Sequence, residues 1–169
     1  MKAFNLNLLF LMVISCVAWA EMKGGMMGGH HHSSGNTANV GDKKFKELVK
    51  ISRGGQLYDN WWKTTVATVK PNKDHPLWKQ QNTNKRSGYD TYRCKECHGW
   101  DYQGKDGAYG KGSHYTGFTG IFETSTKLSL KELEGVLQGE TLAAHDFTEY
   151  LDQDDIADLA YFLKKGLVD

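Results

Sequence analysis

Two cysteines and a histidine form a short pattern that could do chemistry. Cys94 and Cys97 are separated by two residues, and His98 follows directly. On a helix such thiols lie about one turn apart, so both can add to the vinyl groups on one edge of a porphyrin while the next imidazole lies below the iron. This C-x-x-C-H pattern is typical of covalent c-type haem attachment. We therefore expect one covalent haem c, with thioether bridges from Cys94 and Cys97 and with His98 as the proximal iron ligand.

Three other uses of a C-x-x-C pair have to be weighed against haem attachment. A thiol-disulfide redox centre usually follows a β-strand in a βαβ unit, and no strand pattern precedes Cys94. A zinc site would need further donors, but the remaining cysteine, Cys16, does not form a second pair. A structural disulfide would suit an oxidising compartment. Haem is favoured because the motif, a predicted export signal and the helical surroundings agree.

The elements that must position this motif are predicted to be helices. Ser129 and Glu132 form a capping box, and Gly139 is a stop signal for the helix that follows. Asp152 begins a second box, which predicts a helix over residues 153–165. Its apolar residues recur at helical spacing and fit one buried face. Because no strand-like alternation of any length competes, the fold class expected is all-α.

The segment before the motif has a different composition. Helical spacing of apolar residues predicts a helix over residues 42–52, which Gly54 and Gly55 should interrupt. A short helix or turn is expected to hold the aromatic patch at residues 57–62. Both prolines fall within residues 68–83, which should form a loop across the surface. These parts together are interpreted as a helical and aromatic N-terminal extension, residues 42–83.

Residues 84–169 resemble class I cytochromes c, which are single-haem proteins. Three features are similar: a short helix ending in the haem motif, a glycine-rich loop after it, and a capped C-terminal helix. The resemblance implies an all-α, cytochrome c-like domain wrapped around one covalent haem, with its first and last helices crossing near the haem. The residues implied at that crossing are Gly88, Tyr89 and Tyr92 on one side and Leu159, Tyr161, Phe162 and Leu163 on the other.

The resemblance leaves the partner of the proximal histidine open. In the family, the loop after the motif packs under this histidine, and a proline carbonyl commonly accepts its Nδ1–H. The corresponding loop here, residues 99–120, contains no proline, and His114 or its neighbours occupy that position. Which backbone carbonyl orients His98 is therefore not given by the sequence.

The sixth iron ligand is expected to differ from the family's usual methionine. All 5 methionines precede the motif: Met1, Met12, Met22, Met26 and Met27. His145 occupies the place of the family's distal ligand, just before the capped C-terminal helix. We therefore expect bis-histidine iron, with His98 and His145 as metal ligands. His114 is a less favoured alternative, and an open site or a ligand from outside the domain is another.

The first twenty residues resemble a targeting signal. Lys2 precedes an apolar run over residues 8–18, which ends in the small-residue site Ala18-Trp19-Ala20. We therefore expect a signal peptide, residues 1–20, and a periplasmic protein. The alternative is a lipobox ending at Cys16, which would make the protein a membrane-anchored lipoprotein. No later segment approaches the roughly 20 apolar residues of a transmembrane span.

Residues 21–41 lack periodicity and are rich in glycine, methionine and histidine. They include a run of three histidines, His30 to His32. Such a stretch can bind copper or nickel ions, but a flexible tether is the simpler interpretation. The chain would thus consist of a signal peptide, a tether, an extension and a cytochrome c domain.

Charge and motif together indicate a function class. With 21 Lys and Arg against 20 Asp and Glu, the composition gives no reason to expect a nucleic-acid partner. The expected role is a periplasmic monohaem cytochrome that carries single electrons between redox partner proteins, and not an enzyme in itself. Alternatives are a haem-bearing subunit of a larger dehydrogenase complex, docked through residues 57–78, a haem sensor with a displaceable sixth ligand, and a haem-free thiol oxidoreductase.

Overall fold

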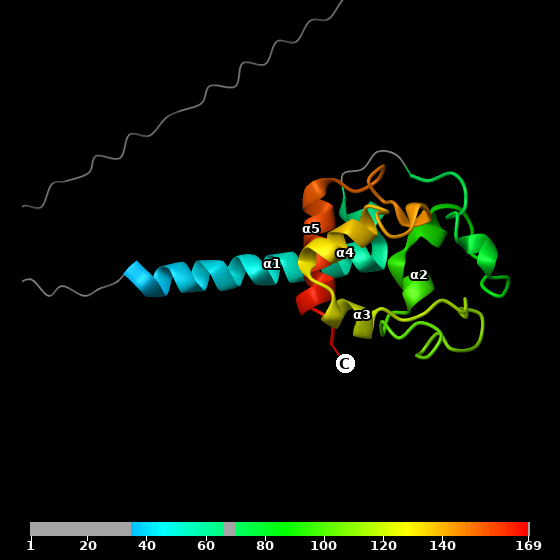
Figure 1. The fold of residues 1–169 in the computed structure, drawn as a ribbon, viewed down its shortest axis with the longest axis horizontal. Coiled ribbons are helices and arrows are strands. Elements are labelled where there is room, and N and C mark those ends of the chain that lie inside the picture. Colours follow the sequence, from blue (N-terminus) through cyan, green and yellow to red (C-terminus); the bar gives the residue numbers. More distant parts are fainter. Residues whose placement is uncertain (1–34, 66–69, 169) are drawn as a thin grey trace, which may run out of the picture. The chain divides into compact units, whose positions relative to one another are not determined.

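The computed structural model describes residues 35–65 and 70–168. The expected signal peptide, the lipobox cysteine Cys16 and most of the expected tether, residues 21–41, lie outside these residues. The described elements are α1 (Gly35–Thr64), η1 (Trp78–Gln80), η2 (Gly88–Tyr92), α2 (Cys94–His98), α3 (Phe122–Lys127), α4 (Leu130–Leu137), η3 (Ala143–His145) and α5 (Gln153–Lys165), where η denotes a 3₁₀ helix (Figure 1).

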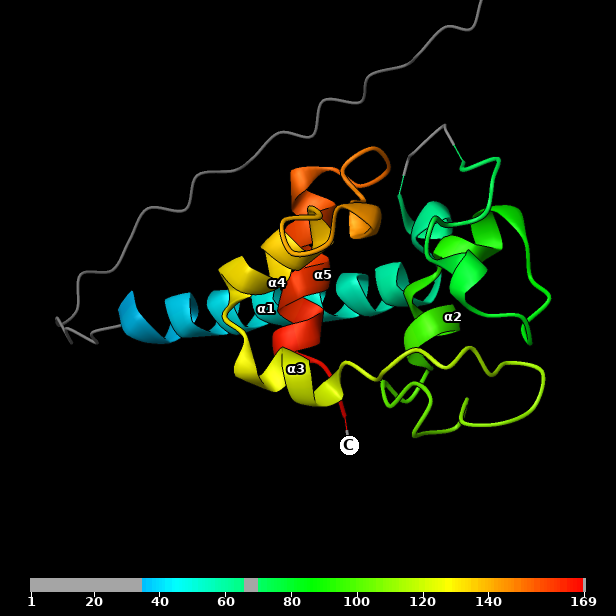
Figure 2. The same ribbon diagram turned by 45° about the vertical axis from the view of Figure 1, so that its right-hand side comes forward.

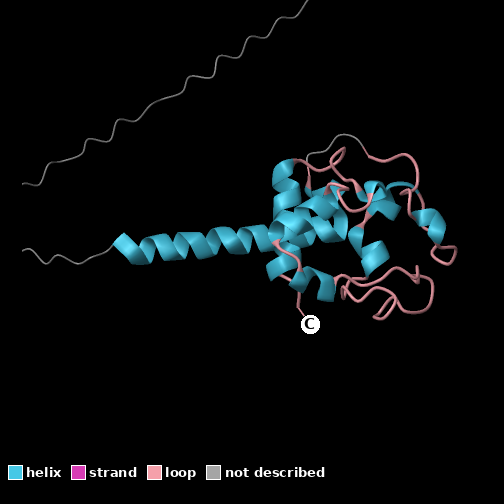
Figure 3. Cartoon of the chain, viewed as in Figure 1, coloured by secondary structure: helices cyan, strands magenta, loops and turns pink. Residues whose placement is uncertain are grey.

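The expectation of a helical fold is confirmed. Within the described residues there is no β-strand, and the extended pairing consists of two isolated bridges, Gly104 with Thr119 and Gln138 with Asp146. Helices and loops alone make up the drawn secondary structure (Figure 3). The segment between α2 and α3 is irregular, as its glycine content predicts.

Both predicted capping boxes are present. The Ser129 hydroxyl accepts the Glu132 N–H, and the Glu132 carboxylate accepts the Ser129 N–H, at the start of α4. Asp152 and Asp155 make the same reciprocal pair at the start of α5. Each pair satisfies backbone donors that have no partner inside the helix, and this fixes where the helix begins.

The prediction that Gly54 and Gly55 interrupt the first helix is wrong. The helix α1 continues through both glycines to Thr64, with a break at Asn60, whose backbone is extended (φ −160°, ψ 79°). A Cβ atom added at Gly54 would collide with the backbone carbonyl of Asp158 and would lie 2.5 Å from the Cβ of Phe162. These glycines therefore allow α1 and α5 to approach closely, and they do not end a helix.

The expected helix crossing involves Phe162 of α5, as predicted, but its partner is α1 and not residues 88–92. The helices α1 and α5 cross each other, with Gly54 and Gly55 against Phe162 (Figures 1 and 2). Residues 88–92 form the short helix η2, which is too brief to span α5. The boundary expected at residue 84 does not separate two units, because residues 34–169 form a single compact unit.

Side chains expected in a separate extension belong to the main core. Leu57 and Trp61 are fully buried, and Trp62 is nearly so. They pack with apolar residues of α4, α5 and the segment between those helices: Leu133, Leu137, Phe147, Leu151, Ile156, Leu159, Ala160, Phe162 and Leu163. The tryptophans therefore extend the core, and the docking surface that we considered for residues 57–78 is not exposed as a whole.

Residues 68–83 are expected to form a loop across the surface, and for the described residues 70–83 this is only partly correct. They are irregular apart from η1, but His75 and Trp78 are buried, with 6% and 5% of their surfaces exposed. The Trp78 Nε1–H donates to the carbonyl of Arg86. The segment therefore folds inward on the motif. None of the described helices is long and apolar enough to cross a membrane.

Candidate functional site

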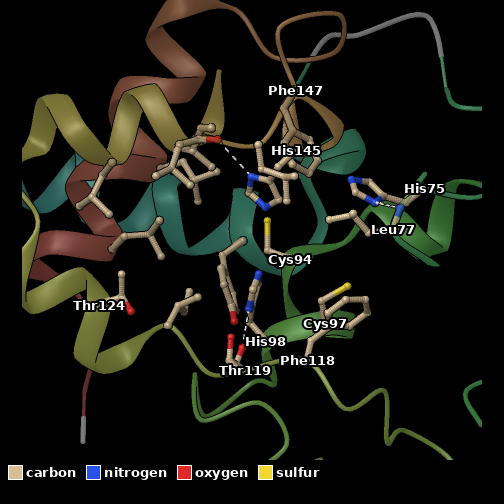
Figure 4. A pocket seen from close by; sticks show the side chains of 18 of the residues that line it. His75, Leu77, Cys94, Cys97, His98, Phe118, Thr119, Thr124, His145 and Phe147 are labelled. Carbon is tan, nitrogen blue, oxygen red and sulfur yellow. Dashed lines mark hydrogen bonds between the residues drawn. The ribbon is translucent and has the colours of Figure 1, made fainter. Parts of the chain in front are cut away.

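The motif helix α2 borders a cavity of about 390 Å³. The cavity wall is formed by α2, the inner faces of α4 and α5, and the segments around residues 75–80, 118–128 and 141–147 (Figure 4). Apolar side chains dominate the wall, among them Leu133, Leu137, Leu159 and Leu163. A cavity of this size and lining is typical of a site for a mainly apolar ligand.

The helix α1 fixes the position of α2. The Tyr58 hydroxyl donates to the Gly99 carbonyl over 2.7 Å, directly after the motif. The Trp61 Nε1–H donates to the Tyr92 carbonyl over 3.2 Å, directly before it. Because these bonds hold both ends of a helix of only five residues, α2 does not depend on its own helical stability.

Both motif cysteines contribute to the cavity wall. Cys94 and Cys97 are free thiols, and their sulfurs face the cavity (Figure 4). Burial raises the pKa of each thiol to about 12. The reactive form in thiol-disulfide exchange is the thiolate, which is scarce at neutral pH when the pKa is this high.

The partner of His98, which the sequence left open, is the carbonyl of Thr119. The distance from His98 Nδ1 to that oxygen is 2.9 Å. Thr119 is held near α2 by its bridge to Gly104, whose N–H in turn donates to the His98 carbonyl over 2.8 Å. Since a carbonyl can only accept, Nδ1 carries the proton and Nε2 keeps a free electron pair. Burial lowers the pKa of His98 to about 4, so the ring is neutral at neutral pH.

His145 lies across the cavity from His98. It ends the short helix η3, and its Nδ1 is 3.2 Å from the carbonyl of Val136 in the last turn of α4. The carbonyls in the last turn of a helix have no partner within that helix, so the Val136 carbonyl is available to accept a hydrogen bond. Here too Nδ1 donates, Nε2 keeps its electron pair, and burial lowers the pKa of the ring.

The spacing of the two imidazoles fits a single metal ion between them. Two imidazoles on opposite sides of one ion, with metal–nitrogen bonds of about 2.0 Å, have ring centres about 6.3 Å apart. The ring centres of His98 and His145 are 6.3 Å apart. The free electron pairs, the ring spacing and the adjacent cysteines Cys94 and Cys97 therefore fit a covalently attached haem.

His114, the alternative sixth ligand, is placed elsewhere. It is not among the residues that line the cavity. Its ring stacks on Tyr109, with ring centres 4.7 Å apart and an angle of 18° between the planes. The structure thus brings His98 and His145 together and leaves His114 in the glycine-rich loop.

One residue of the site was missed by the sequence analysis. His75 lines the cavity, and its ring centre is 6.3 Å from that of His145. Burial lowers the pKa of His75 to about 4. The residue stands alone in a polar segment without periodicity, so no spacing in the sequence marks it.

Compared with models of protein families, with curated proteins and with solved structures, the chain matches none of them. Within the part of the chain that the structure describes, no group of three or more His, Cys, Asp or Glu side chains is arranged to hold a metal ion. A haem iron needs fewer protein donors, because the porphyrin supplies four ligands and the protein only the axial ones. Support for a haem site therefore comes from the geometry of the cavity and its side chains.

Proposed function

We propose that this chain is a monohaem c-type cytochrome that transfers single electrons between redox partner proteins. Cys94 and Cys97 would hold the haem through thioether bonds, and His98 and His145 would bind its iron. The observation that supports this most strongly is the pair of neutral imidazoles with their ring centres 6.3 Å apart, beside the two motif thiols. When bound, the haem supplies an iron centre that exists in two oxidation states one electron apart.

The residues around the axial histidines keep both rings in place. The Thr119 and Val136 carbonyls accept the Nδ1 protons, which fixes ring orientation and makes Nε2 the available donor atom. Since both histidines belong to short helices that are hydrogen-bonded to their surroundings, neither has to move between oxidation states. A fixed pair of ligands suits electron transfer, because little rearrangement accompanies a change of charge.

The nature of the sixth ligand and the cavity wall set the electron affinity. Imidazole in place of methionine lowers the reduction potential, since methionine ligation raises it. The apolar side chains that α4 and α5 contribute to the wall would shield a bound iron from water and so oppose the extra positive charge of the oxidised state. The protein therefore adjusts the potential through ligand identity and through burial.

Haem content and ligation can be tested on the purified protein. Acid-acetone extraction should leave the haem on the polypeptide, and the spectrum should be low-spin in both oxidation states. The reduced wild type should not bind carbon monoxide, whereas the reduced His145→Ala variant should. Haem released into the extract would contradict covalent attachment. Carbon monoxide binding by the wild type would instead favour the sensor function.

We also propose export to the periplasm with cleavage after Ala20, on the basis of the Ala-x-Ala site in the sequence. The intact mass of the mature protein should correspond to a chain that begins at Glu21. A diacylated species that begins at Cys16 would instead show the lipoprotein form. Neither result changes the expectation that haem is attached at Cys94 and Cys97.

A second candidate function is supported by one observation. The N-terminal half of α1 extends past the other helices (Figure 1) and exposes the apolar side chains of Val40, Phe45, Leu48 and Val49, of which 47–67% of the surface is accessible. Such a stripe is compatible with a haem-bearing subunit of a larger dehydrogenase complex. Purification from the native cell without detergent distinguishes the two: a free carrier elutes at the mass of one chain, and a subunit elutes with the complex.

A further inference from the structure

The third histidine of the cavity, His75, has a role that ring spacing alone does not identify. Its ring centre lies 6.3 Å from that of His145, the same separation as between His98 and His145. Distance would therefore allow His75 to pair with His145 as an iron ligand in place of His98. The hydrogen bonds of the three rings decide between these roles.

His75 is held in one orientation by contacts from several elements. Its backbone N–H donates to the Thr91 hydroxyl over 2.8 Å, and that hydroxyl donates to the Gly88 carbonyl over 2.7 Å. The ring stacks on Phe147 at 5.7 Å and 27°, and the edge of Tyr92 meets it at 4.8 Å. With 6% of its surface exposed, the ring has little room to turn.

The proton of His75 lies on the opposite ring nitrogen from that of His98 and His145. The Leu77 backbone N–H donates to His75 Nδ1 over 3.2 Å. An amide N–H can only donate, so Nδ1 must accept and the neutral ring carries its proton on Nε2. In His98 and His145, Nδ1 donates to carbonyls and Nε2 keeps the free electron pair. The rings of His98 and His145 can therefore bind a metal ion through Nε2, whereas the Nε2 of His75 can donate a hydrogen bond.

The Nε2–H of His75 is directed into the cavity. Figure 4 shows the other ring nitrogen bonded to Leu77, while Nε2 faces the space beside His145. Among the hydrogen bonds of residues 35–65 and 70–168, the one to the His75 ring is made by Nδ1 and none is made by Nε2. Nε2 therefore faces the space of the cavity, and a ligand that fills this space has to offer an acceptor or leave the donor without one.

The charge of the wall indicates what this acceptor is. Arg93 is the cation among the described lining residues, and its guanidinium is shared by three carboxylates, those of Asp59, Asp90 and Glu96. An anionic group of the ligand near His75 therefore depends on neutral donors. A porphyrin of the haem type has carboxylates on its edge, and these accept hydrogen bonds strongly.

We propose that His75 is a hydrogen-bond donor to a carboxylate of the bound haem and is not an iron ligand. This inference rests on the proposed haem function. By drawing negative charge toward Nε2–H, His75 weakens the field of that carboxylate at the iron, which favours the reduced state. The residue is thus a positioning and potential-setting group of the site.

The test compares the loaded wild-type protein with His75→Gln and His75→Phe. Glutamine retains a side-chain N–H donor, whereas phenylalanine retains the ring that stacks on Phe147 and has no donor. Infrared redox-difference spectra are recorded on protein whose haem carboxylates are labelled with ¹³C, together with the midpoint potential. In His75→Phe, a labelled carboxylate band should shift and the potential should fall. In His75→Gln both should stay closer to wild type, and both variants should remain low-spin.

Two results would overturn the role of His75. If His75→Phe leaves the labelled bands and the potential unchanged, the residue only packs. If His75→Phe becomes high-spin or binds carbon monoxide when reduced, His75 is an iron ligand. Wild-type protein that contains no haem would overturn the proposed function itself, which is a separate outcome.

A further variant tests the same inference if His75→Phe does not fold. With His75 as a donor, reduced His145→Ala has an open site and binds carbon monoxide. If His145→Ala instead stays low-spin and closed, while His145→Ala combined with His75→Gln opens, His75 replaces His145 at the iron and the proposal is wrong.

Discussion

The packed helices and the loops around the motif are built in different ways. In α1, α4 and α5, apolar side chains such as Leu57, Leu133 and Ile156 are almost completely buried against one another. In residues 70–121 the buried groups include polar ones, such as Thr91 and the carboxylate of Glu96, and the inner side faces the cavity. Both parts line the cavity, but the buried apolar cluster is formed by the helical part, so the loop part would depend more on a ligand there. Its stability should therefore be linked to ligand binding.

Removal of both thioether bridges should produce the largest difference in stability between the helical part and the loop part. We expect Cys94→Ala combined with Cys97→Ala to yield a chain without covalent haem. Amides of α1, α4 and α5 should keep most of their protection from hydrogen exchange, while those of residues 70–121 should exchange much faster than in the wild type. Exchange measured by mass spectrometry checks this. Equal loss of protection in both parts would show that the helical part does not stay folded without the haem.

A methyl group at the crossing should weaken the helical part itself. Gly54→Ala places a Cβ against Asp158 and Phe162, and we expect the free energy of unfolding to fall by about 3 kcal/mol, as in severe overpacking. The matched control is Gly41→Ala, because nothing lies within 4 Å of that position in the same helix. There, alanine should raise stability by about 0.5–1 kcal/mol. Denaturant titration measures both, and equal effects would contradict the close crossing.

In the chain without haem, acid should weaken the loop part through His75, because no haem carboxylate is then present to favour the protonated ring. Burial lowers the pKa of this ring to about 4, and an unfolded histidine titrates near 6.5. Between these values the unfolded chain binds a proton that the folded chain does not, so stability should fall as pH falls from about 6.5 to about 4, by a total on the order of 3 kcal/mol. Denaturant titrations across this range, compared with His75→Gln, isolate the contribution. If the free energy of unfolding falls with pH equally steeply in His75→Gln, groups other than His75 cause the fall.

The smallest effect is expected at the cap of α4. Ser129→Ala removes the acceptor for the Glu132 N–H and should lower the free energy of unfolding by about 1 kcal/mol. The exposed loop residue Ser113 provides a control, since Ser113→Ala removes no cap. The haem spectrum should be unchanged in both variants. A changed spectrum in Ser129→Ala would show that weakening the start of α4 changes the position of His145.

Local signals in the sequence predicted local structure well. The capping boxes at Ser129 and Asp152 were predicted correctly because the partners are three residues apart and their chemistry is independent of the rest of the chain. The short helix of the motif and the irregular glycine-rich loop after it were also expected. The all-α class was predicted correctly for the same reason, because it follows from many such local helix signals taken together.

Distant contacts were not accessible from the sequence. Gly54 and Gly55 have the composition of a helix stop, and only the approach of α5 shows why glycine is needed there. Likewise, the carbonyl of Thr119 becomes the partner of His98 through a fold of the loop that no motif marks. His75 was missed because its role depends on a cavity built by residues far along the chain.

The crossing of α1 and α5 also has a consequence for the order of events during folding. Arg53 and Asp158, which are paired at the crossing over 3.0 Å, are 105 residues apart in sequence, and the motif lies between them. Closing so long a loop is entropically costly and cannot happen before the last helix is synthesised. Until then α1 has no α5 to pack on, and the cavity lacks the wall residues Leu159 and Leu163. The site beside Cys94 and Cys97 is therefore complete only when the C-terminal helix docks.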